Sequence, residues 1–238
     1  MEKLLTIVIP CKNEESNIKR LLLELKQQDI QNTAIILADA KSTDRTRVLA
    51  NTYAFELNLN LRVVNGGMPA VGRNTGARFA KTPYILFLDA DITFTSRHAI
   101  QEALDCIHNR PIDMVGTTPR YKGDFDIRAW LLFRLNLVVT WYLSKTQPFA
   151  IGGFTLVKRS LFKKLGGYDE RATQSEDWLL SRQINPSRFL LIPDLITQDN
   201  RRFKQYGYCK MIKLLLTNFI NRKNIHHFYK DVGYFKKS

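Results

Sequence analysis

Tyr84-Ile85-Leu86-Phe87-Leu88-Asp89-Ala90-Asp91 is the stretch that decides the fold of this chain. Its apolar run follows Pro83 and is typical of a buried strand in an open sheet, and it ends abruptly in two carboxylates. In open α/β sheets, ligands bind beyond the carboxyl ends of the strands. Carboxylate oxygens suit Mg²⁺ or Mn²⁺, particularly when a diphosphate completes the coordination, but Asp is also common in simple turns. The stretch alone leaves both a metal site and a strand-terminal turn open.

Strands and helices alternate on the N-terminal side of this stretch. The pattern predicts strands at 4–9, 34–38 and 61–64, and helices at about 16–25, 44–55 and 71–80. We expect the first strand to stop at Pro10, which cannot continue a central ladder. Short connections imply a parallel sheet with crossover helices, an architecture typical of nucleotide binding. No dinucleotide fingerprint or P-loop is present, which disfavours an NAD enzyme or a P-loop NTPase.

The C-terminal side has a different pattern. It predicts helices at about 96–108, 127–143 and 161–165, a helix after Ser175, and strands at 113–116, 149–157 and 189–192. Gly152-Gly153 lies inside the predicted strand 149–157, and paired glycines there indicate a bulge or a close backbone approach to a ligand. Ser175 is expected to cap a helix with Glu176 and Asp177 in its first turn, where carboxylates are favourable. Capping preference alone would also explain both acids.

Composition indicates a folded cytoplasmic protein. The chain has 238 residues, 45% of them hydrophobic and 24% charged, which suits one α/β domain or a domain with an extension. The three cysteines and four histidines show no metal-ligand spacing, and the cysteines are typical of reduced thiols. We find no secretory signal and no apolar run long enough to span a bilayer, so we expect a cytoplasmic location.

The net charge of +14 is concentrated at the C-terminus. Residues 201–238 contain ten Lys and Arg and a single acid, Asp231. Such a block points to an anionic partner: nucleic acid, an anionic membrane surface or a phosphorylated substrate. An apolar stripe at 211–220 is more typical of a core, but its basic neighbours also fit surface binding. The apolar helix 127–143 fits packing on the domain, on a partner subunit or on a membrane.

The order of these pieces resembles the inverting nucleotide-sugar glycosyltransferases of family 2, which have the GT-A fold. The resemblance spans about residues 5–203, and the ordered set of motifs is far more specific than any one of them. The matching stretches are Thr6-Ile7-Val8-Ile9-Pro10-Cys11-Lys12-Asn13-Glu14, Asp39-Ala40-Lys41-Ser42-Thr43-Asp44, Gly72-Arg73-Asn74-Thr75-Gly76-Ala77, Asp89-Ala90-Asp91, Gly152-Gly153-Phe154, Leu165-Gly166-Gly167-Tyr168-Asp169-Glu170 and Ser175-Glu176-Asp177.

The resemblance implies a role for particular residues. Asp39 would hold the nucleotide base, with the loop from Pro10 to Glu14 lining the same pocket, and Arg73 would lie near the nucleotide and diphosphate. Asp91 would be the main metal-binding carboxylate, and Asp89 would assist the ribose or the metal. The other implied residues are the catalytic base Asp177, the donor-site residues Gly153 and Glu176, and Arg202 in a basic loop, Arg201-Arg202-Phe203, that covers the diphosphate.

These roles imply an α/β GT-A fold, a mostly parallel sheet flanked by helices, in residues 1–203. Residues 1–110 would bind the donor, residues 111–203 would hold the acceptor and the base, and 204–238 would form a basic helical extension. The cofactor would be Mn²⁺ or Mg²⁺, and the acceptor a saccharide, a lipid or a lipid-linked molecule. We expect no nucleic acid partner, and the location would be the cytoplasm, with peripheral contact to the inner face of the cell membrane as an option.

Some features depart from the family pattern. The common Asp-Asp-Gly-Ser-Thr-Asp appears here as Asp39-Ala40-Lys41-Ser42-Thr43-Asp44, which leaves the base open. The Gln-x-x-Arg-Trp motif of processive synthases is absent, so we expect non-processive transfer. Retention instead of inversion also stays open, because related GT-A folds host both. The alternatives are a metal-dependent nucleotidyltransferase, which also uses paired carboxylates, and a basic nucleic-acid-binding module, for which no recognised motif is present.

Overall fold

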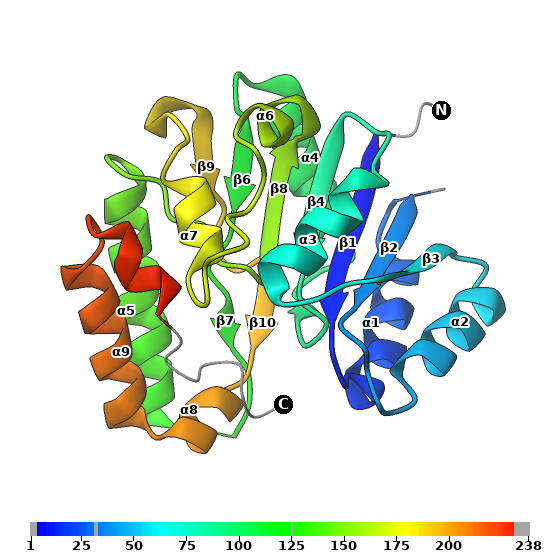
Figure 1. The fold of residues 1–238 in the computed structure, drawn as a ribbon, viewed down its shortest axis with the longest axis horizontal. Coiled ribbons are helices and arrows are strands. Elements are labelled where there is room, and N and C mark those ends of the chain that lie inside the picture. Colours follow the sequence, from blue (N-terminus) through cyan, green and yellow to red (C-terminus); the bar gives the residue numbers. More distant parts are fainter. Residues whose placement is uncertain (1–3, 31–32, 125, 231–238) are drawn as a thin grey trace.

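The computed structural model describes residues 4–30, 33–124 and 126–230, and within them seven strands form the central sheet (Figure 1). Their order across the sheet is β3-β2-β1-β4-β8-β6-β9. The strands are β1 (Leu5–Cys11), β2 (Ala34–Asp39), β3 (Asn60–Asn65), β4 (Tyr84–Leu88), β6 (Met114–Gly116), β8 (Phe154–Lys158) and β9 (Phe189–Leu191). Strands β1 to β4 are parallel, and β8 runs antiparallel between β4 and β6. The predicted mostly parallel α/β sheet is confirmed.

Helices cover both faces of this sheet, so the fold has three layers. Side chains of β1 such as Ile7 and Ile9 point to one face and pack with Ile18 and Leu22, whereas Val8 points to the other face. The first face is covered by α1 (Glu15–Gln27), α2 (Thr46–Glu56) and α4 (Ala99–Asn109), and the second by α3 (Pro69–Arg78), α6 (Arg159–Lys164) and α7 (Glu176–Ser181). Because both faces are buried, the strands are apolar throughout rather than alternating.

Most strand boundaries differ from the prediction by one residue, and β1 and β8 differ by more. Strand β1 continues through Pro10 to Cys11, because this end of β1 pairs only with β2, and its pairing with β4 ends at Val8. Pro10 lacks an N–H group, but on the side of β1 that faces β4 there are no inter-strand hydrogen bonds at this position for it to interrupt. Strand β8 begins at Phe154, so the Gly152-Gly153 pair forms a turn before the strand and does not lie inside it.

A second, small sheet joins distant parts of the chain. It consists of β5 (Thr93–Phe94), β10 (Ile196–Gln198) and β7 (Arg120–Tyr121). Beyond it lie α5 (Ile127–Ser144), α9 (Tyr208–Ile220) and the 3₁₀ turn η2 (Ile225–Tyr229), at the left of Figure 1, and α8 (Arg201–Tyr206), at the bottom. A further 3₁₀ turn, η1 (Pro186–Arg188), precedes β9. The proposed domain division after residue 203 stays a prediction, and that residue lies inside α8.

The segment after β10 is tied to the rest of the molecule by specific contacts. Tyr208 Oη donates to Asp126 Oδ2 at 2.7 Å, which joins the start of α9 to the start of α5. Asn218 Nδ2 donates to Gln174 Oε1 at 3.2 Å, next to α7. Among the described helices, none combines the length and the apolar character that crossing a membrane requires.

Candidate active site

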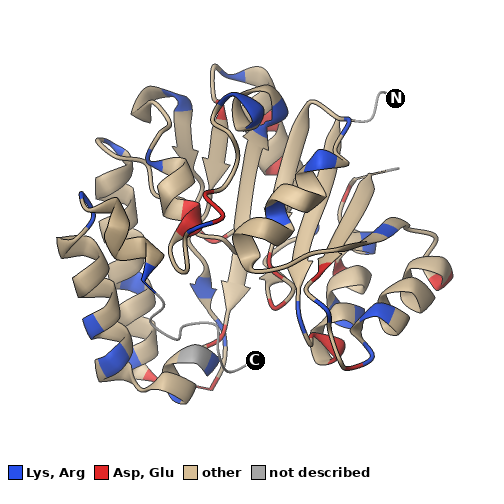
Figure 2. Ribbon diagram, in the orientation of Figure 1, with Lys and Arg blue, Asp and Glu red and all other residues tan. Residues whose placement is uncertain are grey.

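The candidate site lies at the carboxyl ends of β1, β2 and β4. Asp39 is the last residue of β2, Pro10 lies near the end of β1, and Asp89 and Asp91 follow β4 directly. Parallel strands in this order bring these residues to one edge of the sheet. Helix α7 approaches the same part of the molecule from the other half of the chain, and Figure 2 shows acidic residues on the ribbon there.

Arg73 forms the centre of the site. Its side chain is only 3% exposed, Nη2 donates to Asp89 Oδ1 at 2.8 Å, and Nη1 donates to Glu176 Oε1. The guanidinium also lies 5.3 Å from the centre of the Tyr168 ring. Burying an unpaired charge is very costly, so the two carboxylates are what allows Arg73 to be buried. Although burial opposes its charged form, Asp89 and Glu176 hold the pKa of Arg73 above its usual range.

Close packing of α3 on β1 places Arg73 there. A Cβ atom on Gly76 would lie 2.3 Å from Val8 Cγ1, and one on Gly72 would lie 3.2 Å from Pro10 Cβ. Only a residue without a side chain lets the helix backbone approach the strand this closely. The two glycines that flank Arg73 in α3 therefore let this part of the helix lie close to β1.

Asp177 lies in the first turn of α7, beside Arg73. Its Oδ2 accepts a hydrogen bond from the backbone N–H of Gly152, and its Oδ1 accepts one from the N–H of Trp178 at 2.8 Å. Burial raises the pKa of Asp177 to about 7, and the charge of Glu176 adds to this effect while Arg73 opposes it. A carboxylate whose pKa lies near neutrality is suited to general base catalysis.

The prediction that the side chain of Ser175 caps α7 is wrong. Ser175 occupies the N-cap position, but its φ is 54° and its side chain makes no capping hydrogen bond. Asn218 Nδ2 instead donates to Ser175 Oγ at 3.3 Å. The left-handed backbone of Ser175 is a strained conformation that functional sites often contain.

The glycine pair brings the backbone close to the charged side chains. A Cβ atom on Gly152 would lie 2.5 Å from Arg73 Nη2 and 3.2 Å from Asp177 Oδ2. The carbonyl of Gly153 accepts a hydrogen bond from the N–H of Asp89 at 3.4 Å. The turn before β8 therefore links the end of β4 to the first turn of α7.

Asp91 faces a second arginine. Arg201 Nη2 donates to Asp91 Oδ2 at 2.9 Å. Burial raises the pKa of Glu14, and the nearby charges of Asp91 and Asp89 also raise it while Asn17 and Arg201 lower it. Asp91 and Glu14 are thus next to the cluster around Arg73.

The donor set at Asp89 and Asp91 fits Mg²⁺ or Mn²⁺ bound together with a diphosphate. Within the described residues, no group of three or more His, Cys, Asp and Glu side chains forms a metal cage. Hard cations in phosphate-transfer sites are commonly held by one or two carboxylates, with phosphate and water oxygens as the other ligands. Two acids at one strand end match that arrangement.

Asp39 lies one strand further from β4 than Pro10 and is fully buried. It accepts hydrogen bonds from the N–H of Ser42, at 3.2 Å, and from Ser42 Oγ, and Arg47 Nη1 lies 3.3 Å from its Oδ2. The N–H of Glu14 donates to Thr46 Oγ1 at 2.8 Å, which fixes the loop after β1. These hydrogen bonds fix the ends of β1 and β2, where the base is expected to bind.

The structure brings most predicted residues together, and it adds others. Arg73, Asp89, Gly153, Glu176 and Asp177 form one cluster. The prediction of a basic loop at 201–203 is wrong, because these residues form the first turn of α8. The side chain of Arg202 lies outside the described part of the structure. Two residues of the candidate site were not predicted. Arg47 pairs with Asp39 and lies in α2, and Tyr168 lies beside Arg73 and belongs to one of the quoted motifs. Their types alone did not indicate their partners.

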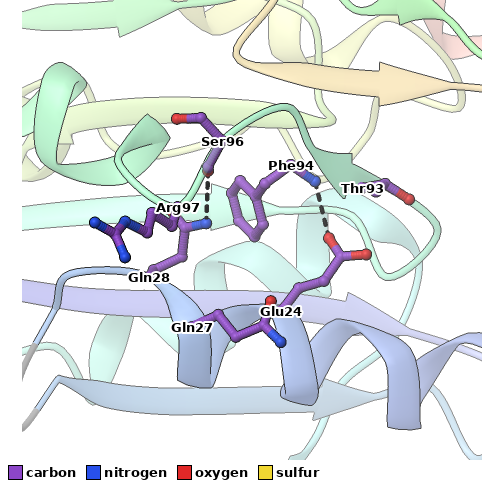
Figure 3. A pocket seen from close by; sticks show the side chains of 7 residues that line it. All are labelled: Glu24, Gln27, Gln28, Thr93, Phe94, Ser96 and Arg97. Atoms are coloured by element: carbon purple, nitrogen blue, oxygen red, sulfur yellow. Dashed lines mark hydrogen bonds between the residues drawn. The ribbon is translucent and has the colours of Figure 1, made fainter.

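The pocket in Figure 3 is separate from these residues. It has a volume of about 290 Å³ and lies between the end of α1 and the segment that contains β5. Its polar groups are paired within the wall: the N–H of Phe94 donates to Glu24 Oε2 at 2.8 Å, and Gln28 Nε2 donates to the carbonyl of Ser96 at 2.9 Å. We assign this pocket no part in the candidate site, because none of the predicted site residues lines it.

Curated proteins similar to this chain are longer than it is. An uncharacterised glycosyltransferase of Haemophilus influenzae is 27% identical over 77% of this chain and 63% of its own length. The 4,4'-diaponeurosporenoate glycosyltransferase of Staphylococcus haemolyticus is 24% identical over 71% of this chain and 48% of its own length. The chain therefore spans about half to three-fifths of these relatives.

Solved structures share the fold. Mannosyltransferase PcManGT from Pyrobaculum calidifontis, in complex with GDP-Man and Mn²⁺, superposes with a TM-score of 0.66 at 20% identity, over 83% of this chain and 57% of that one. TarS 1–349 of S. aureus, in complex with UDP-GlcNAc, superposes with a TM-score of 0.64 at 18% identity, over 83% of this chain and 59% of that one. These likenesses confirm the GT-A architecture. The family model described as "Glycosyl transferase family 2" matches residues 6–166, more than half of the chain, and the protein therefore belongs to this family.

Proposed function

We propose that the protein transfers one sugar from a nucleoside-diphosphate sugar to an acceptor hydroxyl or phosphate, with inversion and without processivity. The observation that carries the proposal is the position of Arg73, which is paired with Asp89 after β4 and with Glu176 beside Asp177. Asp89 on the donor side and Glu176, the neighbour of the proposed base Asp177, are thus held on either side of one buried cation. Direct displacement requires this separation of roles, because one group stabilises the leaving group while another activates the nucleophile.

The donor half of the proposal uses the strand ends. Asp39 binds the base, and the loop from Pro10 to Glu14 lines that pocket. Asp89 and Asp91 would hold Mn²⁺ or Mg²⁺, and the bound ion would neutralise charge that develops on the departing nucleoside diphosphate. Arg201 and Arg202 are placed in a helix whose basic residues supply charge-assisted hydrogen bonds to the diphosphate.

The acceptor half uses Asp177. Its pKa of about 7 keeps a substantial fraction ionised at neutral pH and leaves it basic enough to take a proton from a hydroxyl. The N–H of Gly152 fixes one carboxylate oxygen, so the orientation of the base is set by the backbone. No second acid is needed, because the sugar is attacked directly by the acceptor, which in this proposal is a saccharide, a lipid or a lipid-linked molecule.

A donor screen by thermal shift tests this proposal. Each nucleotide-sugar is added with and without Mn²⁺, because a ligand that binds the folded state raises its apparent stability. We expect at least one nucleotide-sugar to raise the melting temperature only with Mn²⁺, and we expect Asp91→Ala to abolish that shift. Asp177→Asn should keep the shift and lose transfer.

Two results would contradict the proposal. One is the absence of any stabilising or hydrolysed nucleotide-sugar, and the other is transfer by Asp177→Asn at the wild-type rate. Release of pyrophosphate from a nucleoside triphosphate would instead support a nucleotidyltransferase.

A further inference from the structure

Helix α9 presents its apolar stripe away from the protein. Its exposed large side chains recur at helical spacing: Ile212, Leu215, Leu216, Phe219 and Ile220. The opposite face carries Met211, which is buried, and Asn218, which contacts Gln174. A helix on the surface of a globular domain normally has the reverse arrangement. The expectation that this stripe belongs to a core is therefore wrong for most of its members.

Helix α5 shows the same inversion along its whole length. Within its 18 residues, only Ala129 and Thr140 are buried. Leu131, Leu135 and Val138 are exposed and follow one face, and Trp130, Trp141 and Tyr142 are exposed beside them. Soluble monomers rarely leave so many large apolar side chains of neighbouring turns exposed without a partner.

Basic residues lie within this apolar surface. Neither α5 nor α9 contains an acidic residue, and the chain has none between Arg201 and Lys230. In Figure 2 both helices carry Lys and Arg without acids. The guanidinium of Arg134 lies 5.7 Å from the ring centre of Trp130, and Lys145 Nζ lies 3.5 Å from that of Trp141. These pairs place cations directly beside exposed indole rings.

This chemistry distinguishes a bilayer from a protein partner. Trp and Tyr are enriched at the level of lipid headgroups, and Lys and Arg extend from an apolar face toward anionic headgroups. The centre of a protein–protein interface is instead depleted of Lys and of unpaired charge. Basic charge within the apolar face of a helix that contains no acid is complementary to an anionic membrane surface.

The two helices also connect to the candidate base. Tyr208 joins α9 to Asp126 at the start of α5. Asn218 donates to the side chains of Gln174 and Ser175, which directly precede Glu176 and Asp177. Arg182 Nη1, just after α7, donates to the carbonyl of Arg222 at 3.0 Å. The helix that carries Asp177 is therefore anchored to the segment with the apolar stripe.

We propose that the exposed faces of α5 and α9 bind the surface of an anionic lipid bilayer and hold the acceptor-side acid Asp177 close to it. The assignment of Asp177 rests on the proposed function, whereas the lipid-binding surface rests on exposure and charge alone. The substrate class that follows is an acceptor carried in the membrane, whose reacting group projects from the headgroup layer.

Vesicle flotation of the full chain, without donor or metal, tests the surface. Vesicles of equal parts phosphatidylglycerol and phosphatidylcholine are compared with pure phosphatidylcholine vesicles. The test variant is Leu135→Glu with Leu216→Glu, at positions 58% and 57% exposed. The matched control is Val48→Glu with Phe55→Glu, at positions 65% and 89% exposed on α2, at the opposite edge of the molecule (Figure 1).

We expect wild type and control to float with the anionic vesicles at about 0.1 M salt and to bind much less at about 1 M. The test variant should bind at least about tenfold more weakly, because acids then meet anionic headgroups and apolar contact is lost. Its melting temperature should match that of the control, since both replace exposed residues.

The proposed lipid-binding surface would be refuted if the wild type did not float with the vesicles, or if the test variant bound them as well as the wild type does. So would a concentration-dependent dimer that the test variant dissociates, because the faces would then bind a second copy. Donor binding is measured separately: flotation without donor binding would defeat the proposed function alone, and donor binding without flotation would defeat this inference alone.

Discussion

Arg201 donates to Asp91 at 2.9 Å although the two residues are 110 positions apart in the chain. The carboxylate proposed as the main metal ligand is thus paired with a cation of the protein itself. A divalent cation and Arg201 would compete for Asp91, and the incoming diphosphate offers Arg201 a second anionic partner. We infer that α8 changes its contacts when the donor binds.

Arg201→Ala should therefore have opposite effects on two measurements. Mn²⁺ titrated without donor should bind more tightly, because the ion no longer competes with Arg201 for Asp91. Transfer should fall by about 10²-fold, as for removal of one donor to a developing negative charge. Stability should change by only about 0–1 kcal/mol, since the Arg201 side chain is half exposed.

Arg188→Ala is the matched control for this prediction. Arg188 pairs with Asp113 at the other end of the sheet, where β6 and β9 begin. This substitution should leave Mn²⁺ affinity and transfer unchanged. Equal effects of both substitutions would refute a specific role for Arg201.

The rate of transfer should rise with pH through about 7. Burial and Glu176 raise the pKa of Asp177 to about 7, and only the ionised form can accept the proton of an acceptor. The measurement is kcat/KM against pH, which reports the free enzyme. A profile that is flat between pH 6 and 8 would exclude Asp177 as the titrating base.

The same shift predicts a stability change in Asp177→Asn. Asp177 has a higher pKa in the folded state than the ordinary 3.8, so the folded state binds more protons between these two values. Wild-type stability should therefore fall as pH rises from about 4 to about 7 through this group. Asp177→Asn should remove that decline, so that it exceeds wild type in urea unfolding at pH 8 and matches it near pH 4. A variant less stable than wild type at pH 8 would contradict the shift.

Gly152→Ala should disturb the charged cluster. The added methyl would lie 2.5 Å from Arg73 Nη2, so the guanidinium or the turn must move. We expect a loss of stability of about 1–3 kcal/mol and a fall in kcat larger than that loss explains. Gly153→Ala is the comparison, because its methyl would meet only Ile196 and Ile92, at 3.1 and 3.3 Å. If both variants lose kcat equally, crowding of Arg73 is not the cause.

Asp39→Asn should weaken donor binding. The change keeps the shape of the side chain but replaces an acceptor oxygen with an N–H donor. Loss of a hydrogen bond to a charged group is worth about 1.5–3 kcal/mol, or about 10- to 100-fold in affinity. Titration of the preferred nucleotide-sugar measures this effect, with vesicle flotation as a control that should not change. Unaltered donor affinity would remove Asp39 from the base pocket.

The sequence predicts the sheet and most of the residues that meet in the candidate site, because these residues follow the ends of strands. Asp39, Asp89 and Asp91 end apolar runs, and parallel strands bring their ends to one edge. The small second sheet was not predicted, since strands of two or three residues such as β5 have too little pattern. The pairing of Arg201 with Asp91 depends on tertiary folding over 110 positions, which local pattern does not encode.

Periodicity also could not assign the apolar stripe of α9. A repeat of apolar residues at helical spacing indicates one apolar face but does not tell whether protein or lipid covers it. The structure shows which way the apolar stripe faces: Met211 and Asn218 face the protein, and Leu216 faces outward. The basic residues next to this outward face, already visible in the sequence, then support the proposed binding to anionic lipid.

The position of β8 has a consequence for synthesis of the chain on the ribosome. β8 pairs with β4 on one side and with β6 on the other, yet it is the last of the three to be made. Until Phe154–Lys158 has emerged, β4 has an open edge of unpaired backbone groups in an apolar strand, which invites pairing with other chains. A nascent chain ending between β6 and β8 should therefore be the species most prone to aggregate and the one that most requires chaperones.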